Sequence, residues 1–287
     1  MILITGANGK TGRSIIPHLV KRGERVRALD IPAAQAQLRD MGVEPIAGDL
    51  REISSLRPAL KGVQTVYHIP PRLQADELQL GKNMIAAAKA EGVQRFVYHS
   101  VIFPHLESVV FHWEKMKVEV ELFQSGLPFT IIEPTNYMQN LFWQWAFVEK
   151  RSELLLPYSA EQPITWLDLH DFGEAVAKVL TQPDHEGATY QLCSTGKALT
   201  WREIAALISK LLDREIKAIK LPVAEYLKLP SWQGMTPEGM ERLVTMFHHY
   251  DQYGFRCGNN RVLSMLLGRP ATTYEQFLRR SLRELKG

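Results

Sequence analysis

Met1-Ile-Leu-Ile-Thr-Gly-Ala-Asn-Gly-Lys-Thr-Gly-Arg13 is the stretch from which the rest of the fold can be worked out. An apolar run ends abruptly in a turn with three glycines, and an amphipathic segment follows. The expected apolar face of that segment is Ile15, Ile16, Leu19 and Val20. This order of patterns predicts a strand, a tight turn and a helix.

The three glycines lie at positions 6, 9 and 12, directly after the expected strand. Gly6 permits a sharp turn, Gly9 lets the backbone approach a pyrophosphate, and Gly12 lets the helix pack closely on the strand. The N–H groups and the partial positive charge at the start of the helix favour phosphate. A plain turn between strand and helix is the alternative, but it does not need three glycines at this spacing. We therefore expect dinucleotide binding.

Composition and charge are those of an ordinary globular protein. The chain has 287 residues, 45% of them hydrophobic and 23% charged, with a formal net charge of +3. The nearly balanced charge argues against nucleic acid as a partner, and no stretch is long and apolar enough for a membrane span or a signal peptide. Cys193 and Cys257 lack metal-ligand spacing. We expect reduced thiols, no bound metal and a cytoplasmic location.

Strand-like and helix-like segments alternate over the first half of the chain. The expected strands are residues 2–4, 25–30, 43–47, 65–69, 95–100 and 128–133, and the helices after the first are 32–41, 53–60, 77–91 and 109–124. Parallel strands need crossovers, which place helices on both faces of the sheet. We therefore predict an α/β Rossmann fold, a doubly wound parallel sheet with its ligand at the carboxyl ends of the strands. Residues at those ends are Gly6, Asp30, Asp49, Ile69, Ser100 and Pro134.

The second half of the chain is less regular. Residues 166–180 are typical of a strand end and a helix, with Asp171 as the cap of that helix. A strand is expected at 188–193, a capping box opens a helix at Thr200 and Glu203, and residues 221–287 are expected to be mostly helical. We expect residues 1–155 to form the dinucleotide-binding domain, with 163–182 packing back on it. Residues 183–287 are expected to form a smaller, mostly helical substrate-binding cap domain.

An aromatic run follows the last expected strand of the sheet. Its members are Tyr137, Phe142, Trp143, Trp145 and Phe147. Rings at helical spacing are typical of a buried helix face, which is the favoured interpretation. The alternative is a pocket for a flat, apolar substrate.

Asp30 lies just past the second strand. A carboxylate at this position accepts hydrogen bonds from the ribose hydroxyls of NAD and repels the additional phosphate of NADP. The alternative is a turn aspartate without a ligand.

By residue 140 the sequence resembles the NmrA-like branch of the atypical short-chain dehydrogenases/reductases. The resemblance rests on Thr5-Gly-Ala-Asn-Gly-Lys-Thr-Gly12, Gly48-Asp-Leu50, Lys115-Met-Lys-Val-Glu119, Pro134-Thr-Asn-Tyr-Met-Gln-Asn140 and residues 60–67, 92–98, 125–132 and 166–171. It covers most of the first 180 residues and implies a Rossmann domain that binds NAD or NADP. The last hundred residues contribute little to the match.

The resemblance also implies which residues contact the cofactor. These are Ala7, Asn8, Gly9, Lys10 and Thr11 around the phosphates, Asp49 and Leu50 beside the adenine, Ile69, Pro70 and Pro71 along the ribose and pyrophosphate, Lys115 at the nicotinamide ribose, and Pro134, Thr135, Asn136 and Tyr137 at the nicotinamide ring. Relatives of this kind include quinone, dye and aromatic-substrate reductases and non-catalytic redox sensors.

The sequence departs from the family at the second strand. Many relatives have an arginine there that holds the NADP phosphate, whereas this chain reads Leu29-Asp-Ile31. Arg13 keeps NADP possible, because a guanidinium just past the glycine loop can pair with a phosphate. We favour NAD(H) over NADP(H), since a carboxylate repels a phosphate. Pro17, well inside the first helix, is expected to remove a hydrogen bond and to kink the helix.

The usual proton donor of short-chain dehydrogenases is missing. They use a Tyr four residues before the Lys, and Phe111 stands at that position before Lys115. Ser100 stands where those enzymes often place a Ser that orients the carbonyl. Two residues are candidates for the acid, His112 and Tyr137, although each is more often structural. We therefore list Lys115, Tyr137, Ser100 and His112 as candidate catalytic residues.

The expected function is an NAD(P)H-dependent oxidoreductase that passes hydride to a small, quinone-like or aromatic acceptor. Such acceptors take hydride first and a proton later from water, so they tolerate a missing acid. The alternative is a non-catalytic dinucleotide-binding redox sensor that contacts a protein partner. Epimerase or dehydratase chemistry is disfavoured, because those enzymes need the Tyr.

Overall fold

The computed structural model describes residues 1–256 and 258–284, and the chain forms two compact units. The first consists of Met1–Glu107, Phe111–Pro134 and Phe172–Gln191, and the second of Ser108–Val110, Thr135–Asp171 and Leu192–Gly287. Cys193 is a buried thiol of the second unit, whereas Cys257 lies outside the described residues. The assignment of residues 1–155 to the cofactor and 183–287 to the substrate stays a prediction.

The first unit is built around a seven-stranded sheet with the order β10-β6-β5-β4-β1-β2-β3. Its strands are β1 (Ile2–Thr5), β2 (Val26–Asp30), β3 (Glu44–Ala47), β4 (Thr65–His68), β5 (Arg95–His99), β6 (Phe129–Pro134) and β10 (Thr189–Leu192). The neighbours from β3 to β6 pair in parallel. The chain builds the sheet outward from β1 in both directions, so the predicted doubly wound parallel sheet is confirmed.

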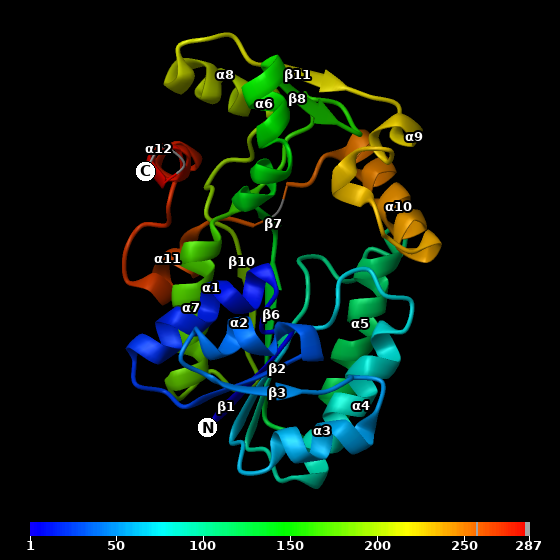
Figure 1. Ribbon diagram of the computed structural model, residues 1–287, viewed down its shortest axis with the longest axis vertical. Coiled ribbons are helices and arrows are strands. Elements are labelled where there is room, and N and C mark those ends of the chain that lie inside the picture. The colour runs from blue at the N-terminus through cyan, green and yellow to red at the C-terminus, as the bar shows by residue number, and fades with distance from the viewer. Residues whose placement is uncertain (257, 285–287) are drawn as a thin grey trace. The chain divides into compact units, whose positions relative to one another are not determined.

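Helices cover both faces of this sheet (Figure 1). On one face lie α1 (Lys10–Lys21) and the part of α7 (Leu169–Thr181) that belongs to the first unit. On the other lie α3 (Ile53–Leu60), α4 (Glu77–Ala90) and α5 (Val110–Gln124), while α2 (Gln35–Arg39) follows the short 3-10 helix η1 (Pro32–Ala34). Apolar side chains of α3, α4 and α5 form a continuous core with Leu3, Val66 and Phe96 of the strands.

Two glycines set how closely the helices of the first face approach. A Cβ atom on Gly12 would lie 2.4 Å from the carbonyl oxygen of Ala7, so α1 packs directly on the turn after β1. A Cβ atom on Gly173 would lie 2.0 Å from the carbonyl oxygen of Ser14, so α7 packs directly on α1. Real Cβ atoms are not found at such distances, and glycine is therefore required at both positions.

Two details of α1 differ from expectation. Val20 is not part of the apolar face, because it is 39% exposed while Ile16 and Leu19 are fully buried. Gly12 takes its place in the buried stripe. The helix also continues through Pro17. Pro17 lies on the exposed side, where water can satisfy the carbonyl group that loses its partner.

The second unit contains two short parallel strand pairs and most of the remaining helices. The pairs are β8 (Glu153–Leu156) with β11 (Lys217–Lys220) and β7 (Asn136–Tyr137) with β9 (Trp166–Leu167). The helices are η2 (Met138–Trp143), α6 (Trp145–Arg151), α8 (Trp201–Leu212), α9 (Val223–Tyr226), η3 (Pro230–Trp232), α10 (Pro237–Tyr253), α11 (Arg261–Leu267) and α12 (Tyr274–Glu284). The capping box of α8 and the mostly helical C-terminal region are confirmed. The β8–β11 pair was not predicted.

The aromatic run packs within the second unit. The ring of Phe142 lies 5.9 Å from that of Phe277, and the ring of Trp143 lies 5.6 Å from that of Trp232. Trp145 is only 9% exposed. Trp145 therefore fits the buried-face interpretation, whereas Phe142 and Trp143 pack against other rings but stay partly exposed.

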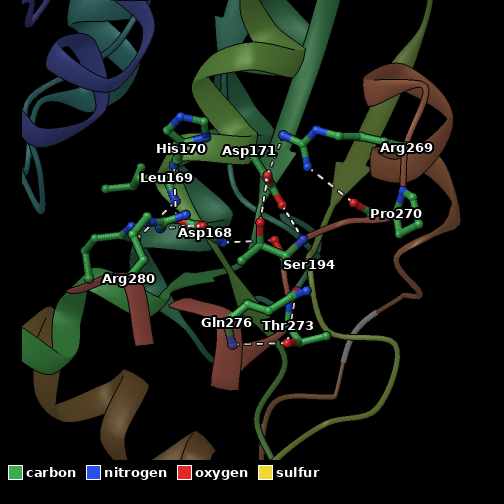
Figure 2. A network of polar contacts seen from close by, with 12 residues as sticks. Asp168, Leu169, His170, Asp171, Ser194, Arg269, Pro270, Thr273, Gln276 and Arg280 are labelled. Atoms are coloured by element: carbon green, nitrogen blue, oxygen red, sulfur yellow. Dashed lines mark hydrogen bonds and ion pairs between the residues drawn. The ribbon is translucent and has the colours of Figure 1, made fainter. Parts of the chain in front are cut away.

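Two fully buried carboxylates hold the C-terminal helices to the start of α7 (Figure 2). Asp168 accepts hydrogen bonds from Arg280, Gln139 and the backbone N–H of His170. Asp171 accepts from Arg269 and from the N–H and hydroxyl groups of Thr272. The expectation that Asp171 caps α7 is wrong, because the helix begins at Leu169 and Asp171 lies inside its first turn.

We predict that Gly173→Ala destabilises the protein by about 1–3 kcal/mol, because the added methyl group forces α7 away from α1. Urea unfolding measures the change. Lys21→Ala, at the exposed end of α1, is the matched control and should change stability by less than about 0.5 kcal/mol. Equal stabilities of Gly173→Ala and the control would contradict the close packing.

Candidate functional site

The turn after β1 has the geometry that the glycine spacing predicts. Gly6 has a φ angle of +56°, and a Cβ atom there would lie 3.1 Å from the carbonyl oxygen of Ile69. Gly9 is exposed and immediately precedes α1. The first helical hydrogen bond runs from the N–H of Arg13 to the carbonyl of Gly9, so the N–H groups of residues 10–12 lie at the open end of the helix. This cradle suits a phosphate group.

One hydroxyl group joins the ends of β1 and β4. The Thr5 Oγ1 atom donates to the carbonyl of Ile69 at 2.9 Å and accepts from the N–H of Ile69 at 2.8 Å. The strand order reverses between these two strands, which is where doubly wound sheets bind ligands. The predicted cofactor segments at residues 6–13 and 69–71 are thereby brought together.

Asp30 holds the glycine loop. Its Oδ2 atom accepts from the N–H of Asn8 at 2.8 Å, and its Oδ1 atom accepts from the N–H of Ile31 at 2.8 Å. Each oxygen keeps a lone pair that a ribose hydroxyl could use. Arg13, which could serve an NADP phosphate, donates to the Oδ1 atom of Asn8 at 3.1 Å.

Two cations lie near the start of α1. Partial desolvation, and then the charge of Arg72, lower the pKa of Lys10 to about 8, although both side chains keep contact with solvent. Desolvation also lowers the pKa of Arg72. Cations that repel each other are stabilised by a bound anion, so this end of the loop fits the phosphates of a dinucleotide. Lys10 was predicted from the sequence, whereas Arg72, which follows the predicted Pro71, was not.

The remaining predicted adenine and ribose residues lie at the same strand ends. Leu50 and Pro70 are buried, whereas the side chains of Asp49 and Pro71 are exposed. Asp49 accepts from the N–H of Arg51 at 2.9 Å. Their contacts with adenine and ribose stay predictions.

Lys115 lies on the inner face of α5, against the end of β5. Its Nζ atom lies 2.6 Å from the Oε1 atom of Glu77, 3.3 Å from the carbonyl oxygen of His99 and 5.5 Å from the centre of the Tyr98 ring. The hydroxyl of Tyr98 donates to the same Glu77 oxygen at 3.1 Å. The Lys115 side chain is 12% exposed and that of Glu77 is 2% exposed. The pair is therefore a nearly dry ion pair.

Ser100 and two further carboxyl groups lie beside this pair. The Ser100 hydroxyl donates to the Oε1 atom of Glu119, one helical turn after Lys115 on the same face of α5. Burial, reinforced by Glu133, raises the pKa of Glu119 to about 7, against the opposing effects of the Ser100 hydrogen bond and Lys115. Burial also raises the pKa of Glu133, which accepts from Gln191 at 2.9 Å.

Three carboxyl groups of this region were not predicted from the sequence: Glu77, Glu119 and Glu133. Glu119 could have been found, because a residue four positions after Lys115 on a helix shares its face. Glu133 ends the predicted sixth strand, so its position at the carboxyl end was also readable. Glu77 lies on a different helix, and nothing local in the sequence connects it with Lys115.

The two candidate acids lie in different surroundings. His112 is fully buried, its Nδ1 atom lies 3.1 Å from the carbonyl oxygen of Phe103, and its ring packs against Phe111. Tyr137 lies in β7 of the second unit and pairs with Leu167. The catalytic roles of both stay predictions.

The segment expected at the nicotinamide ring is divided between the two units. Pro134 ends β6 in the first unit, whereas Thr135 and Asn136 belong to the second. Thr135 donates to the carbonyl of Thr165 at 3.1 Å, and Asn136 donates to the hydroxyl of Tyr250 at 3.1 Å. The contact of this segment with nicotinamide stays a prediction.

Within residues 1–256 and 258–284, no three side chains of His, Cys, Asp or Glu are grouped so that they could hold a metal ion. Over the same ranges, no helix has the length and apolar character needed to cross a membrane.

The glycine cradle, the switch point and the buried lysine define a Rossmann protein of the dinucleotide-binding class. Residues 1–273 match the model of the NmrA-like family, and the chain belongs to that family. The resemblance inferred from the sequence is thereby confirmed.

Characterised relatives match nearly the whole chain. An NAD(P)H azoreductase from Xenophilus azovorans is 29% identical over 280 residues, which cover 96% of each chain. Quinone oxidoreductase 2 of Escherichia coli is 25% identical over 276 residues, which cover 95% of this chain and 96% of the relative. The crystal structure of that NADPH-dependent enzyme with NADPH superposes with a TM-score of 0.84, covering 98% of this chain and all of the other.

We predict that Lys115→Met destabilises the protein by about 3 kcal/mol, because it leaves the Glu77 carboxylate buried without its cation. The double variant Lys115→Met/Glu77→Gln should recover part of the loss, since a neutral amide can still accept from Tyr98. Urea unfolding measures both.

The control uses the exposed ion pair of Lys82 and Glu121, which joins the same two helices at 3.0 Å. Lys82→Met should cost less than about 0.5 kcal/mol, because solvent screens exposed charges. Similar losses for Lys115→Met and Lys82→Met would contradict the assignment of a dry ion pair.

Proposed function

We propose that this protein is an oxidoreductase that uses NAD(P)H to reduce quinone-like or aromatic acceptors. The observation that carries the proposal is the glycine cradle at the switch point, with Lys115 held at the end of β5 in the same sheet. The azoreductase and the quinone oxidoreductase, matched over nearly their whole lengths, support the same class of chemistry.

The missing tyrosine restricts the acceptor. When bound, the cofactor supplies the hydride. The cradle and Lys10 bind its phosphates, and Lys115 orients its ribose. Phe111 cannot transfer a proton, so the acceptor must stabilise the added electron pair by resonance before it is protonated. Quinones and azo compounds have this property, whereas an isolated ketone needs an acid placed for it. We also propose a cytoplasmic location, on the basis of cysteine usage.

We propose that NADH is preferred over NADPH. The Asp30 carboxylate ends β2 beside the glycine loop, where it accepts from two backbone N–H groups and keeps its negative charge close to the ribose position. The quinone oxidoreductase of E. coli is NADPH-dependent, so the preference rests on Asp30 of this chain alone.

Cofactor oxidation in the presence of quinones and azo dyes tests the proposed activity. We expect NADH or NADPH absorbance to fall when benzoquinone or an aromatic azo dye is added, and to fall little with an isolated aliphatic ketone, which does not stabilise the added electron pair by resonance. Tight binding of the dinucleotide without turnover of any acceptor would instead support a non-catalytic redox sensor.

Binding of the two cofactors tests the preference. NADH should bind more tightly than NADPH. Asp30→Asn should lower the ratio of the NADPH to the NADH dissociation constant about fivefold to tenfold, because it removes roughly 1 kcal/mol of charge repulsion. Asp40→Asn, at an exposed aspartate of the same unit, should leave the ratio unchanged. Tighter binding of NADPH by the wild type would show that Asp30 does not decide the cofactor.

A further inference from the structure

The region beneath α5 buries more negative than positive charge. Three carboxyl groups are almost inaccessible there, since Glu77 is 2%, Glu119 is 9% and Glu133 is 4% exposed. Among the described residues that face them, Lys115 is the ammonium group in contact. An uncompensated charge costs several kcal/mol to bury, so the region favours protonation of a carboxyl group.

The contacts indicate which carboxyl group holds the proton. Glu77 has the Lys115 ammonium at 2.6 Å and the Tyr98 hydroxyl at 3.1 Å, so its charge is compensated. Glu119 is faced by Ser100 and Tyr98 from the β5 side, by Glu133 from β6 and by Lys115 from its own helix. Its raised pKa of about 7 agrees with a proton that is exchanged near neutrality.

Ser100 connects Glu119 with the ligand-binding edge of the sheet. Ser100 directly follows β5, and its hydroxyl is hydrogen-bonded to Glu119. A serine hydroxyl can accept one proton while it donates another. The carboxyl ends of the strands are where the acceptor of the proposed reaction would lie.

We propose that Ser100 and Glu119 form a proton relay that takes the place of the tyrosine replaced by Phe111. This proposal rests on the proposed function, in which an acceptor is reduced at this edge of the sheet. Ser100 delivers the proton, and Glu119 acts through it as the proton store.

The relay supplies the proton that the acceptor needs after it has received hydride. As the acceptor receives hydride, one of its oxygen or nitrogen atoms becomes anionic. When Glu119 is protonated, it donates to Ser100 Oγ, and the Ser100 hydroxyl, which donates to Glu119 in the structure, turns to the acceptor. The anionic atom then takes the hydroxyl proton of Ser100, while the carboxylic proton of Glu119 moves to Ser100 Oγ. Ser100 is thereby restored, Glu119 becomes a carboxylate, and solvent returns its proton. The acceptor gains one hydride and one proton.

Infrared titration of the cofactor-free protein tests the proton store without any turnover. The wild type should show a protonated carboxyl band that disappears as the pH is raised across neutrality, and Glu119→Gln should lack it. Glu133→Gln should also show the protonated carboxyl band, but the band should disappear at a lower pH than in the wild type. The reason is that the substitution removes a charge that raises the pKa of Glu119. A band unchanged in Glu119→Gln would overturn Glu119 as the store.

The pH dependence of kcat tests the relay itself, with benzoquinone as acceptor. Wild-type kcat should be high at acidic pH and fall as the pH rises through the pKa of Glu119, since a proton donor works only in its protonated form. Glu119→Gln and Ser100→Ala should each lower kcat severalfold at acidic pH and lose this inflection, because water protonates the reduced quinone more slowly than a positioned donor does. Glu133→Gln should keep the acidic plateau and shift the inflection to lower pH.

The two proposals fail in different ways. No turnover by the wild type with any acceptor overturns the proposed function and the relay together. Turnover whose rate and pH profile are unchanged in Glu119→Gln overturns the relay and leaves the proposed function standing. Glu119→Asp is a check on structural damage, because it keeps a carboxyl group on a shorter side chain. Its pH profile of kcat should regain part of the inflection that Glu119→Gln loses, whereas a merely structural role of Glu119 predicts no inflection.

Discussion

The closeness of α1 to the end of β1 is the constraint on which the first unit depends. Only a residue without a side chain allows this approach at position 12, where a Cβ atom would lie 2.4 Å from the Ala7 carbonyl. The close contact aims the start of α1 at the switch point of the sheet. Asp30 then fixes the loop by accepting the N–H of Asn8. Helix packing and the proposed phosphate recognition thus depend on the same glycines.

On the opposite face of the sheet, the constraint is the balance between one buried cation and several buried carboxyl groups. Lys115 is held by Glu77, and further carboxyl groups lie close to this pair. A helix that carries Lys115 and Glu119 one turn apart brings a cation and a proton-binding group to one strand end. Under the proposed relay, the proton chemistry that a tyrosine performs in other short-chain dehydrogenases is assigned to carboxyl groups whose pKa burial raises.

Much of the first unit could be predicted, because local patterns carry it. The glycine spacing, the alternation of strands and helices, and the position of Asp30 all follow from neighbours in sequence. Two predictions were wrong: that Val20 lies on the buried face of α1, and that Asp171 precedes α7 as its cap. Local propensity does not fix the edge of a helix face or the first residue of a helix. Glu77, Arg72 and the β8–β11 pair were missed, because their partners lie far away in the chain. The buried aspartates that bind Arg269 and Arg280 belong to the same category.

The chain leaves the first unit after β6 and returns to it only with the later part of α7 and with β10. During synthesis, the outer edge of β6 and the side of α1 on which Gly173 packs must therefore wait for residues made much later. An unpaired edge strand is a site for mistaken association. The second unit supplies most of the intervening sequence, and the pairing of β7 with β9, both made before β10, shortens the effective loop that has to close. The discontinuous course of the chain thus couples the completion of the cofactor-binding sheet to sequence that the sheet itself does not contain.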